Sequence, residues 1–346
     1  MIFLKPNPKI LVIMTGGTIG SKSNDGIIDV ATNSYNIVDI YRLKYDTSLI
    51  EFETIQPVNL LSENFTLETL QTLGNTLLSI KLSNYDGIII THGSDTLAYT
   101  SAFVGMITRH FKIPVIMVAS NYELSNPKAN GLENFEGAID IIRNQSLRGC
   151  FVVWKDSITH SMNIFLSTRL NECDSYTDNF SAFGGQPFMT IQNHNLVHST
   201  YNYIENVNPE VIDIMANRRS LFQDGIDLSN SHPMLIRTYT GLDYSAISVP
   251  EDTTSIVIYL YHSGTACTVN GKYSLLEFIS NHKDKRIYVA SIKRTKNSYA
   301  TKDAILKSGA IPLYNISVAS AYIKSMLIEC SQSEYLMKHS AFFEEI

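Results

Sequence analysis

The sequence predicts an α/β protein whose parallel sheets are covered by helices on both faces. Two observations lead to this prediction: short runs of continuous apolar residues recur along the chain, and stretches long enough for helices separate them. A strand buried on both faces can be apolar at every position, whereas a strand with one solvated face alternates. The length of 346 residues favours two domains.

The N-terminal half begins this alternation of strands and helices. Apolar runs at 10–14, 87–90, 114–118 and 150–154 predict core strands, and residues 96–111 predict a helix. Each run is bounded by glycine, proline or polar residues, which suits strands of ordinary length.

The middle of the chain has a different composition. Residues 184–208 contain a Gly-Gly pair, a proline, several asparagines and one short β-like piece at 188–191. The alternation then returns after about residue 224, with strands expected at 235–239, 255–260 and 286–291 and helices at 273–281, 299–308 and 317–331. We therefore expect an N-terminal domain at 1–205, a linker at 206–230 and a C-terminal α/β domain at 231–346.

The composition excludes several classes of function. There are 27 Lys and Arg against 33 Asp and Glu, a net charge of −6, so the basic excess of a nucleic-acid-binding protein is missing. The four cysteines lack CxxC spacing, which favours a reducing compartment and disfavours a structural zinc. No apolar run approaches the roughly 18 residues of a membrane helix, and the proline-punctuated start does not resemble a signal peptide. We expect a cytoplasmic protein with no membrane, nucleic-acid or metal partner.

Two segments at expected strand ends combine glycine with hydroxyl side chains. Thr15–Gly20 follows the first strand, and Thr91–Thr96 follows the strand at 87–90. Ligands of open α/β sheets bind beyond the carboxyl ends of the strands. Glycine lets backbone N–H groups approach a ligand or an oxyanion, and a hydroxyl can serve as a nucleophile. Leu61–Asn64 is a third candidate segment.

Each loop taken alone also has a plain structural explanation. A Gly-Gly pair after a strand commonly makes a turn, and Thr or Ser before a helix commonly caps it. A phosphate-binding loop is a further alternative, but Gly16–Gly20 fits neither G-x-G-x-x-G nor the Walker pattern with its lysine.

The two loops together are more specific than either alone. Met14–Gly20 and Gly87–Thr100 resemble, in order and separation, the two signatures of the bacterial-type asparaginase/glutaminase family. The pair Ser62–Glu63 stands where that family has its Ser–Gln or Ser–acid substrate clamp. Val118–Ser120 and the C-terminal stretch 298–328 also resemble the family, so the resemblance covers nearly the whole chain.

The resemblance implies a fold and a reaction. The implied fold is a larger N-terminal flavodoxin-like domain and a smaller Rossmann-like α/β domain, in a homodimer or homotetramer whose sites a neighbouring subunit completes. The implied reaction is hydrolysis of a side-chain amide through an acyl-enzyme on the threonine of the first signature, here Thr18, with no metal and no cofactor. Ser94 and Asp95 of the second signature would bind or activate near the substrate's α-amino group and amide.

The same resemblance implies which residues hold the substrate. Ser62 would bind the α-carboxylate, and Asp95 would hold the α-ammonium group by a charge-assisted hydrogen bond, with Glu63 beside it. Gly93 and Ser120 would line the same site. Because these partners suit an α-amino acid that carries an amide, L-asparagine is the expected substrate.

Several positions depart from the family pattern. Ser94 replaces a threonine and so loses the methyl group that restricts χ1. Arg169 occupies the place of the family's lysine among the catalytic residues, with Lys155 as the alternative, and arginine cannot relay a proton because it stays protonated. Isoleucine stands near the place of the family's lid tyrosine, and Tyr35 is the nearest tyrosine.

Three further residues need an interpretation. Thr265 replaces an asparagine of the family in a loop that, in the family, reaches into the neighbouring subunit's site. His262 in the same loop would be a base with an ordinary pKa near 6.5, and a structural role is the alternative. His92, beside the second signature, is expected to orient the backbone and not the substrate.

The departures leave the substrate open. Glutamine, a D-amino acid or a peptidyl amide would fit the same mechanism. A non-catalytic amino-acid sensor that kept the fold is the alternative from another class. The presence of Thr18 and Asp95 favours an enzyme, because a binding protein has little need of a hydroxyl at the nucleophile position.

Overall fold

The computed structural model describes residues 5, 7–24, 27–30, 37–145, 147–198, 220–294, 298–331, 335–336 and 339–346. The chain forms two compact units: unit 1 is Met1–Ile226 with Ala341–Phe343, and unit 2 is Asp227–Ser340 with Glu344–Ile346. Most of the linker that we predict, residues 206–219, lies outside the described residues. The sequence assigns residues 341–343 to the C-terminal domain, whereas the structure places them in unit 1.

Unit 1 contains an eight-stranded sheet in the order β10-β9-β8-β7-β6-β5-β1-β4. Its parallel strands are β1 (Lys9–Met14), β4 (Glu51–Ile55), β5 (Gly87–Thr91), β6 (Pro114–Val118) and β7 (Gly149–Lys155). Its antiparallel strands are β8 (Met162–Leu166), β9 (Met189–Gln192) and β10 (Asn195–His198). The three central strands β5, β6 and β7 are buried at almost every position, as expected for strands covered on both faces.

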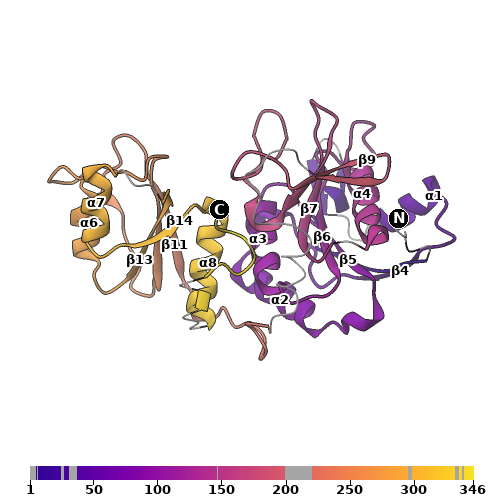
Figure 1. Cartoon of the computed structure of the whole chain (residues 1–346), viewed down its shortest axis with the longest axis horizontal. Helices are drawn as coiled ribbons and strands as arrows, with labels where there is room; N and C mark the ends of the chain where they lie inside the picture. Colours follow the sequence, from indigo (N-terminus) through magenta and orange to yellow (C-terminus); the bar gives the residue numbers. More distant parts are fainter. Residues whose placement is uncertain are drawn as a thin grey trace. The chain divides into compact units, whose positions relative to one another are not determined.

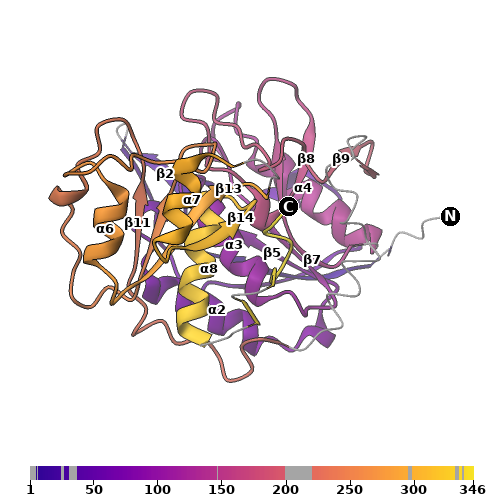
Figure 2. The same cartoon turned by 60° about the vertical axis from the view of Figure 1, so that its left-hand side comes forward.

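The helices of unit 1 lie on both faces of this sheet (Figure 1). They are α1 (Ile37–Lys44), α2 (Leu67–Ser79), α3 (Leu97–Ile107) and α4 (Gly131–Asn144). In Figure 1, α2 and α3 lie to one side of β5, β6 and β7, and α4 lies to the other. The turned view in Figure 2 shows α4 beside the antiparallel strands β8 and β9. Thr66 begins α2 because its side-chain oxygen accepts a hydrogen bond from the Thr69 N–H at 3.4 Å.

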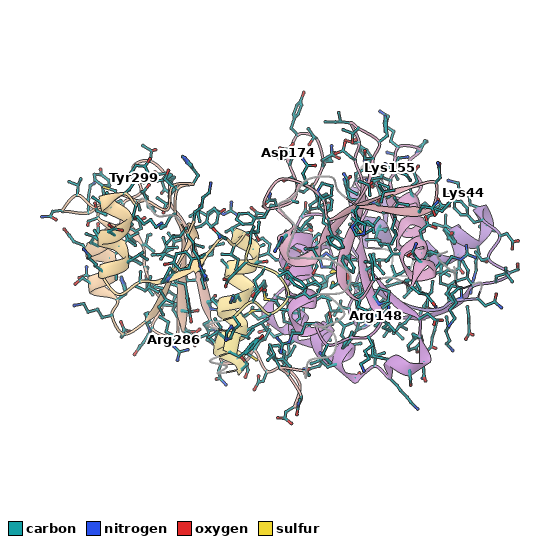
Figure 3. All side chains as sticks on the ribbon, viewed as in Figure 1. Lys44, Arg148, Lys155, Asp174, Arg286 and Tyr299 are labelled. Atoms are coloured by element: carbon teal, nitrogen blue, oxygen red, sulfur yellow. The ribbon has the colours of Figure 1, made fainter. Side chains whose placement is uncertain are left out.

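The register of the parallel strands brings their ends to one level. Thr91 of β5 lies opposite Val118 of β6, and Val118 lies opposite Val153 of β7. Figure 3 shows the direction of these strands, since Arg148 precedes β7 at one end of unit 1 and Lys155 closes it at the other. The segments that follow β5, β6 and β7 therefore begin side by side at the carboxyl edge of the sheet.

Unit 2 contains a four-stranded, fully parallel sheet in the order β11-β12-β13-β14. Its elements are β11 (Pro233–Arg237), β12 (Ser255–Tyr259), β13 (Arg286–Ile292), β14 (Ile311–Tyr314), α6 (Leu275–Asn281), α7 (Ala300–Lys307) and α8 (Val318–Ser331). Helices α6 and α7 lie on one face of this sheet and α8 lies on the other (Figure 1). The apolar side chains of β12 and β13 form the core between these layers.

A buried group of charges stabilises the end of unit 2. Lys324 of α8 is fully buried, and its Nζ lies 3.0 Å from Glu344 Oε1 and 2.6 Å from Glu345 Oε1. Burial opposes the charge on this lysine, but the two carboxylates outweigh burial and raise the pKa of Lys324. Removing one partner of such a group leaves an uncompensated buried charge, so this contact holds residues 344–345 on α8.

The predicted fold class is confirmed, with two refinements. All seven core strands expected from continuous apolar runs are present, although the helix predicted at 96–111 ends at Ile107. The large sheet carries an antiparallel edge that the sequence does not reveal, because β8 and β10 are partly exposed and are not continuous apolar runs. Among the described residues, no helix is both long and apolar enough to cross a membrane.

Candidate active site

The loop after β1 pairs with the segment that precedes Ser62. Gly16 forms a parallel bridge with Leu60, whose N–H donates to Thr15 O at 3.1 Å. The Gly17 N–H donates back to Leu60 O at 2.9 Å. Gly16 has a φ of 95°, and a Cβ there would lie 2.4 Å from Leu60 O, so only glycine fits.

Two further glycines bring the two signature loops into direct backbone contact. Gly17 has a φ of 74°, and a Cβ on it would lie 2.3 Å from the Gly93 nitrogen. A Cβ on Gly93 would in turn lie 2.4 Å from Ser62 Oγ. Thr18 and Ser94 each follow one of these glycines, so the fold brings the expected nucleophile and the second hydroxyl to the same place.

Two threonine hydroxyls fix the loops to one another. Thr15 Oγ1 donates to Thr91 O at 2.7 Å, which joins the end of β1 to the end of β5. Thr96 Oγ1 donates to Ser62 O at 2.9 Å, which joins the segment at 62–64 to the start of α3. The hydroxyl of Thr15 is therefore structural. Thr18 begins the short 3-10 helix Thr18–Gly20 and is half-buried, and no such contact engages its hydroxyl among the described residues.

Ser62 brings to this site a hydroxyl group that lacks a hydrogen-bond partner within the described part of the chain. Its side chain is buried, with 2% exposed, and its Oγ has no hydrogen-bond partner among the described residues. A buried hydroxyl without a partner costs stability, commonly about 1–3 kcal/mol, unless a ligand satisfies it. Its place against Gly93 therefore suits the binding of a substrate group.

Two carboxylates lie close together on the solvent side of the loops. Burial, and secondly the nearby charge of Glu63, raise the pKa of Asp95 above its ordinary value. Both side chains are exposed, and Ser94 between Gly93 and Asp95 is half-buried. A cationic group bound between Asp95 and Glu63 would relieve their mutual repulsion.

His92 is held as a neutral imidazole in the core of the site. Burial lowers its pKa to about 4, although a backbone contact with Gly93 opposes this shift. Its Nδ1 lies 2.8 Å from Gly93 O, and because a carbonyl only accepts, Nδ1 carries the proton. The ring also packs at its edge on Phe65, with 4.6 Å between ring centroids. This histidine orients the Gly93 backbone.

Ser120 lies one strand further along the sheet, just after β6. Its hydroxyl donates to Tyr122 O at 2.5 Å and accepts from the Gly131 N–H at 3.1 Å, where α4 begins. Both contacts are structural, and the expected contact of Ser120 with substrate stays a prediction.

Arg169 closes a short 3-10 helix (Ser167–Arg169) and is buried, with 7% exposed. Its Nε donates to Phe343 O at 2.6 Å, so residues 341–343 of the C-terminus help to hold it. The alternative cation, Lys155, forms an ion pair with Glu133. The sequence contains no signal for the contact between Arg169 and Phe343, because 174 positions separate them.

The segment after Arg169 also approaches the site, which sequence reasoning missed. Tyr99 of α3 donates to Glu172 Oε1 at 2.9 Å. Burial raises the pKa of Cys173 to about 12, and the carboxylates of Asp178 and Asp95 add to this shift. Cys173 is therefore a neutral thiol within the electrostatic reach of Asp95.

The remaining predicted residues belong to the lid region after Thr18 and to unit 2. The lid region is a hairpin of β2 (Ser21–Asn24) and β3 (Ile27–Val30), and Tyr35 lies outside the described residues. In unit 2, Thr265 O accepts from the Tyr261 N–H at 3.1 Å, and His262 Nε2 lies 3.2 Å from Ser263 Oγ. Over the described part of the chain, no group of three or more His, Cys, Asp or Glu side chains could hold a metal ion.

Known proteins resemble this chain over most of its length. Residues 9–203 match the family model for the N-terminal domain of asparaginase. The chain is 26% identical over 344 residues to the L-asparaginase of Thermococcus kodakarensis, covering 98% of this chain and 95% of that protein. It is 23% identical over 334 residues to one of the subunits of the glutamyl-tRNA(Gln) amidotransferase of Thermoplasma acidophilum, covering 92% of this chain and 75% of that protein.

The solved structure of the thermostable L-asparaginase from Thermococcus kodakarensis has the same fold. It matches with a TM-score of 0.79 at 23% identity and covers 98% of this chain and 99% of that chain. The chain belongs to the asparaginase family, and it is an amidohydrolase of that family.

Proposed function

We propose that this amidohydrolase converts L-asparagine and water into L-aspartate and ammonia. Thr18 Oγ1 attacks the carbon of the side-chain amide, its proton passes to the departing nitrogen, and ammonia leaves. A water molecule then hydrolyses the acyl ester and restores the Thr18 hydroxyl. A hydroxyl nucleophile of this kind divides one difficult hydrolysis into two easier steps.

The contact between Gly17 and Gly93 is the observation that carries this proposal. It places Thr18 and Ser94 at adjacent backbone positions at the carboxyl ends of β1 and β5. Glycine at both positions also lets backbone N–H groups come close to the oxyanion that forms on the amide oxygen. Ser94, which directly follows Gly93, is the hydroxyl that we expect to take part in activating Thr18.

The polar groups around these hydroxyls support an α-amino acid as substrate. The unpartnered Oγ of Ser62 is placed to donate to the α-carboxylate. Asp95 and Glu63 together supply negative charge for the α-ammonium group. Similarity to an L-asparaginase over almost the full chain supports the same choice.

The same geometry also suits two alternative functions. Similarity to part of an amidotransferase, together with arginine at position 169, supports an amide substrate other than free L-asparagine, such as glutamine, a D-amino acid or a peptidyl amide. A non-catalytic amino-acid sensor is the second alternative, and it predicts binding without ammonia release.

The proposal extends to assembly and location. We expect a homodimer or homotetramer in the cytoplasm, as the family resemblance and the unpaired cysteines suggest. Light scattering coupled to size-exclusion chromatography measures the assembly, and a monomer at micromolar concentration would contradict it.

Ammonia release by the purified protein is the decisive test. The substrate panel holds L-Asn, D-Asn, L-Gln and asparagine-containing peptides at neutral pH. We expect L-Asn to be hydrolysed, Thr18→Ala to lower kcat by at least about 1000-fold, and Thr18→Ser to keep measurable turnover because it keeps the hydroxyl. No release from any substrate, with L-Asn binding seen by calorimetry, would favour the sensor instead.

A further inference from the structure

A cavity lies at the carboxyl edge of the large sheet in unit 1, among the segments that follow β6 and β7. Its volume is about 580 Å³, within the range of cavities that bind small organic ligands. Tyr122 follows β6, Lys155 and Ile158 follow β7, and Tyr176 and Asp178 come from the loop after Arg169. None of these residues has a part in the proposed cleavage at Thr18.

The strand register shows how close this cavity is to the site. Thr91, Val118 and Val153 lie at one level on β5, β6 and β7. Neighbouring strands are about 4.8 Å apart, so the cavity begins about one strand from the segment that carries Asp95. Figure 3 shows Lys155 and Asp174 at this same end of unit 1.

Cys173 gives a second, independent measure of this proximity. The charges of Asp178 and of Asp95 both raise the pKa of its thiol, after the larger effect of burial. Asp178 lines the cavity, whereas Asp95 belongs to the signature loop. The thiol therefore lies within electrostatic reach of both carboxylates.

Among the Lys, Asp and Glu side chains that line the cavity, Lys128 and Asp178 have no hydrogen-bond or ion-pair partner over the described part of the chain, whereas the others have one. Lys155 is paired with Glu133. Asp156 Oδ1 accepts backbone N–H bonds from Ile158 at 2.9 Å and Thr159 at 2.6 Å. The carboxylate of Asp178 has no hydrogen-bond or ion-pair partner over the described part of the chain. An ammonium group is the natural partner for this carboxylate.

Large apolar groups complete the wall around that carboxylate. Tyr122, Ile158 and Tyr176 are 38%, 66% and 93% exposed and come from three different loops. Isolated exposed apolar residues are common, but three that border one cavity offer a surface for an apolar side chain. The cavity thus combines a place for an ammonium group with a place for an amino-acid side chain.

We propose that this cavity binds the N-terminal residue of a short peptide that ends in asparagine. The peptide's free ammonium group pairs with Asp178, its first side chain packs on Tyr122 and Ile158, and its asparagine amide is cleaved at Thr18. The reaction consumes one water and converts, for example, leucyl-asparagine into leucyl-aspartate and ammonia. This inference rests on the proposed function and names a substrate class for the same site.

Asp178 allows an unusually well-matched variant. Its φ is 54°, in the left-handed region, which asparagine tolerates better than most residues do. Asp178→Asn therefore removes the charge and keeps both the shape and the backbone. Asp303→Asn is the control, because it removes the same charge from an exposed position in unit 2.

The first experiment measures kcat/KM for L-Asn, L-leucyl-L-asparagine and N-acetyl-L-leucyl-L-asparagine. We expect Asp178→Asn to lower the value for leucyl-asparagine about tenfold, the size of one charge-assisted contact, and to leave L-Asn and the acetylated peptide within about twofold. Asp303→Asn should change none of the three. An unchanged value for leucyl-asparagine, or an equal loss for L-Asn, overturns the proposal.

Calorimetry separates this proposal from the proposed function. In Thr18→Ala protein, the additional Asp178→Asn change should weaken the binding of leucyl-asparagine about tenfold and leave the binding of L-Asn unchanged. If no substrate releases ammonia but this pattern of binding holds, the hydrolase proposal fails and the peptide site stands. If L-Asn is hydrolysed but leucyl-asparagine is neither bound nor cleaved, the peptide site alone is wrong.

Discussion

The two units of this protein both carry a parallel sheet, yet the carboxyl edges of the two sheets are built differently. In unit 1, Gly17 after β1 and Gly93 after β5 have no room for a side chain: a Cβ on Gly17 or Gly93 would lie 2.3 or 2.4 Å from a neighbouring atom. In unit 2, Gly241 after β11 and Gly271 after β12 have no atom within 4 Å of a Cβ position. Gly264 is intermediate, with a nearest approach of 3.3 Å.

This difference in packing at the glycines shows how the carboxyl edge of one sheet can form a binding or catalytic site. Parallel strands deliver loops to the same edge in both units, and backbone contacts join loops in both, since the Ser245 N–H donates to Lys272 O at 3.3 Å in unit 2. Among the glycines of these loops that the structure describes, Gly17 and Gly93 of unit 1 lie against the backbone of a remote loop, whereas Gly241 and Gly271 of unit 2 do not. Close packing at Gly17 and Gly93 fixes Thr18, Ser62 and Ser94 without relying on flexible side chains, as catalysis by preorganised groups requires. In unit 2 the loops are rich in hydroxyls and tyrosines, and the glycines there serve ordinary turns.

The largest expected effect comes from filling the glycine contact. Gly17→Ala places a methyl group 2.3 Å from the Gly93 nitrogen at a φ of 74°, so both overpacking and backbone strain oppose folding. We expect a loss of about 3 kcal/mol in the stability of unit 1 and loss of ammonia release. Urea and thermal unfolding measure the first effect.

Gly241→Ala is the matched control for this prediction. Its φ of 83° imposes similar backbone strain, but nothing lies within 4 Å of the new methyl group. We expect a loss of about 1 kcal/mol. Equal losses of stability in Gly17→Ala and Gly241→Ala would show that backbone strain alone causes them and that close packing at Gly17 contributes nothing.

Arg169→Lys tests the buried cation that the family resemblance implies among the catalytic residues. Lysine cannot place a donor where Nε now meets Phe343 O at 2.6 Å, so we expect a loss of stability of about 2 kcal/mol. Because lysine is able to relay a proton, kcat for L-Asn should rise. Arg42→Lys on the exposed face of α1 is the control, and unchanged or lower kcat in Arg169→Lys would contradict a relay limited by arginine.

Ser120→Ala tests whether the substrate-binding site extends to the end of β6. The hydroxyl bonds the Gly131 N–H and Tyr122 O, so we expect a loss of about 1 kcal/mol in stability with KM for L-Asn unchanged. A severalfold rise in KM at unchanged stability would instead establish the substrate contact that the family resemblance implies.

Glu63→Gln has the smallest expected effect, on pH dependence. Asp95 must be ionised to hold an ammonium group, and Glu63 contributes, after burial, to the raised pKa of Asp95. Removing that negative charge lowers the pKa of Asp95, so the acidic limb of the kcat/KM profile for L-Asn should move to lower pH. A limb that moves to higher pH, or does not move in a profile measured from pH 4 to 8, would show that Asp95 does not control it.

The sequence by itself determined the seven strands that have continuous apolar runs, the class of fold and the loops of the candidate site. Continuous apolar runs predict strands such as β5 and β6 because burial on both faces is a local requirement of each strand. Glycine and hydroxyl residues at the ends of β1 and β5 identify the two loops, because strand ends are where ligands bind. Their resemblance to the asparaginase family follows from the order of the residues alone.

Only the tertiary structure decided how these residues are used. The backbone contact between Gly17 and Gly93, the bond from Thr15 to Thr91, and the bond from Arg169 to Phe343 join positions far apart in the chain. Which hydroxyl is structural, as in Thr15, and which buried oxygen lacks a partner, as in Ser62, depends on those contacts. Periodicity along a sequence reports the burial of single elements, whereas hydrogen-bond partners and free space arise only when separate elements meet.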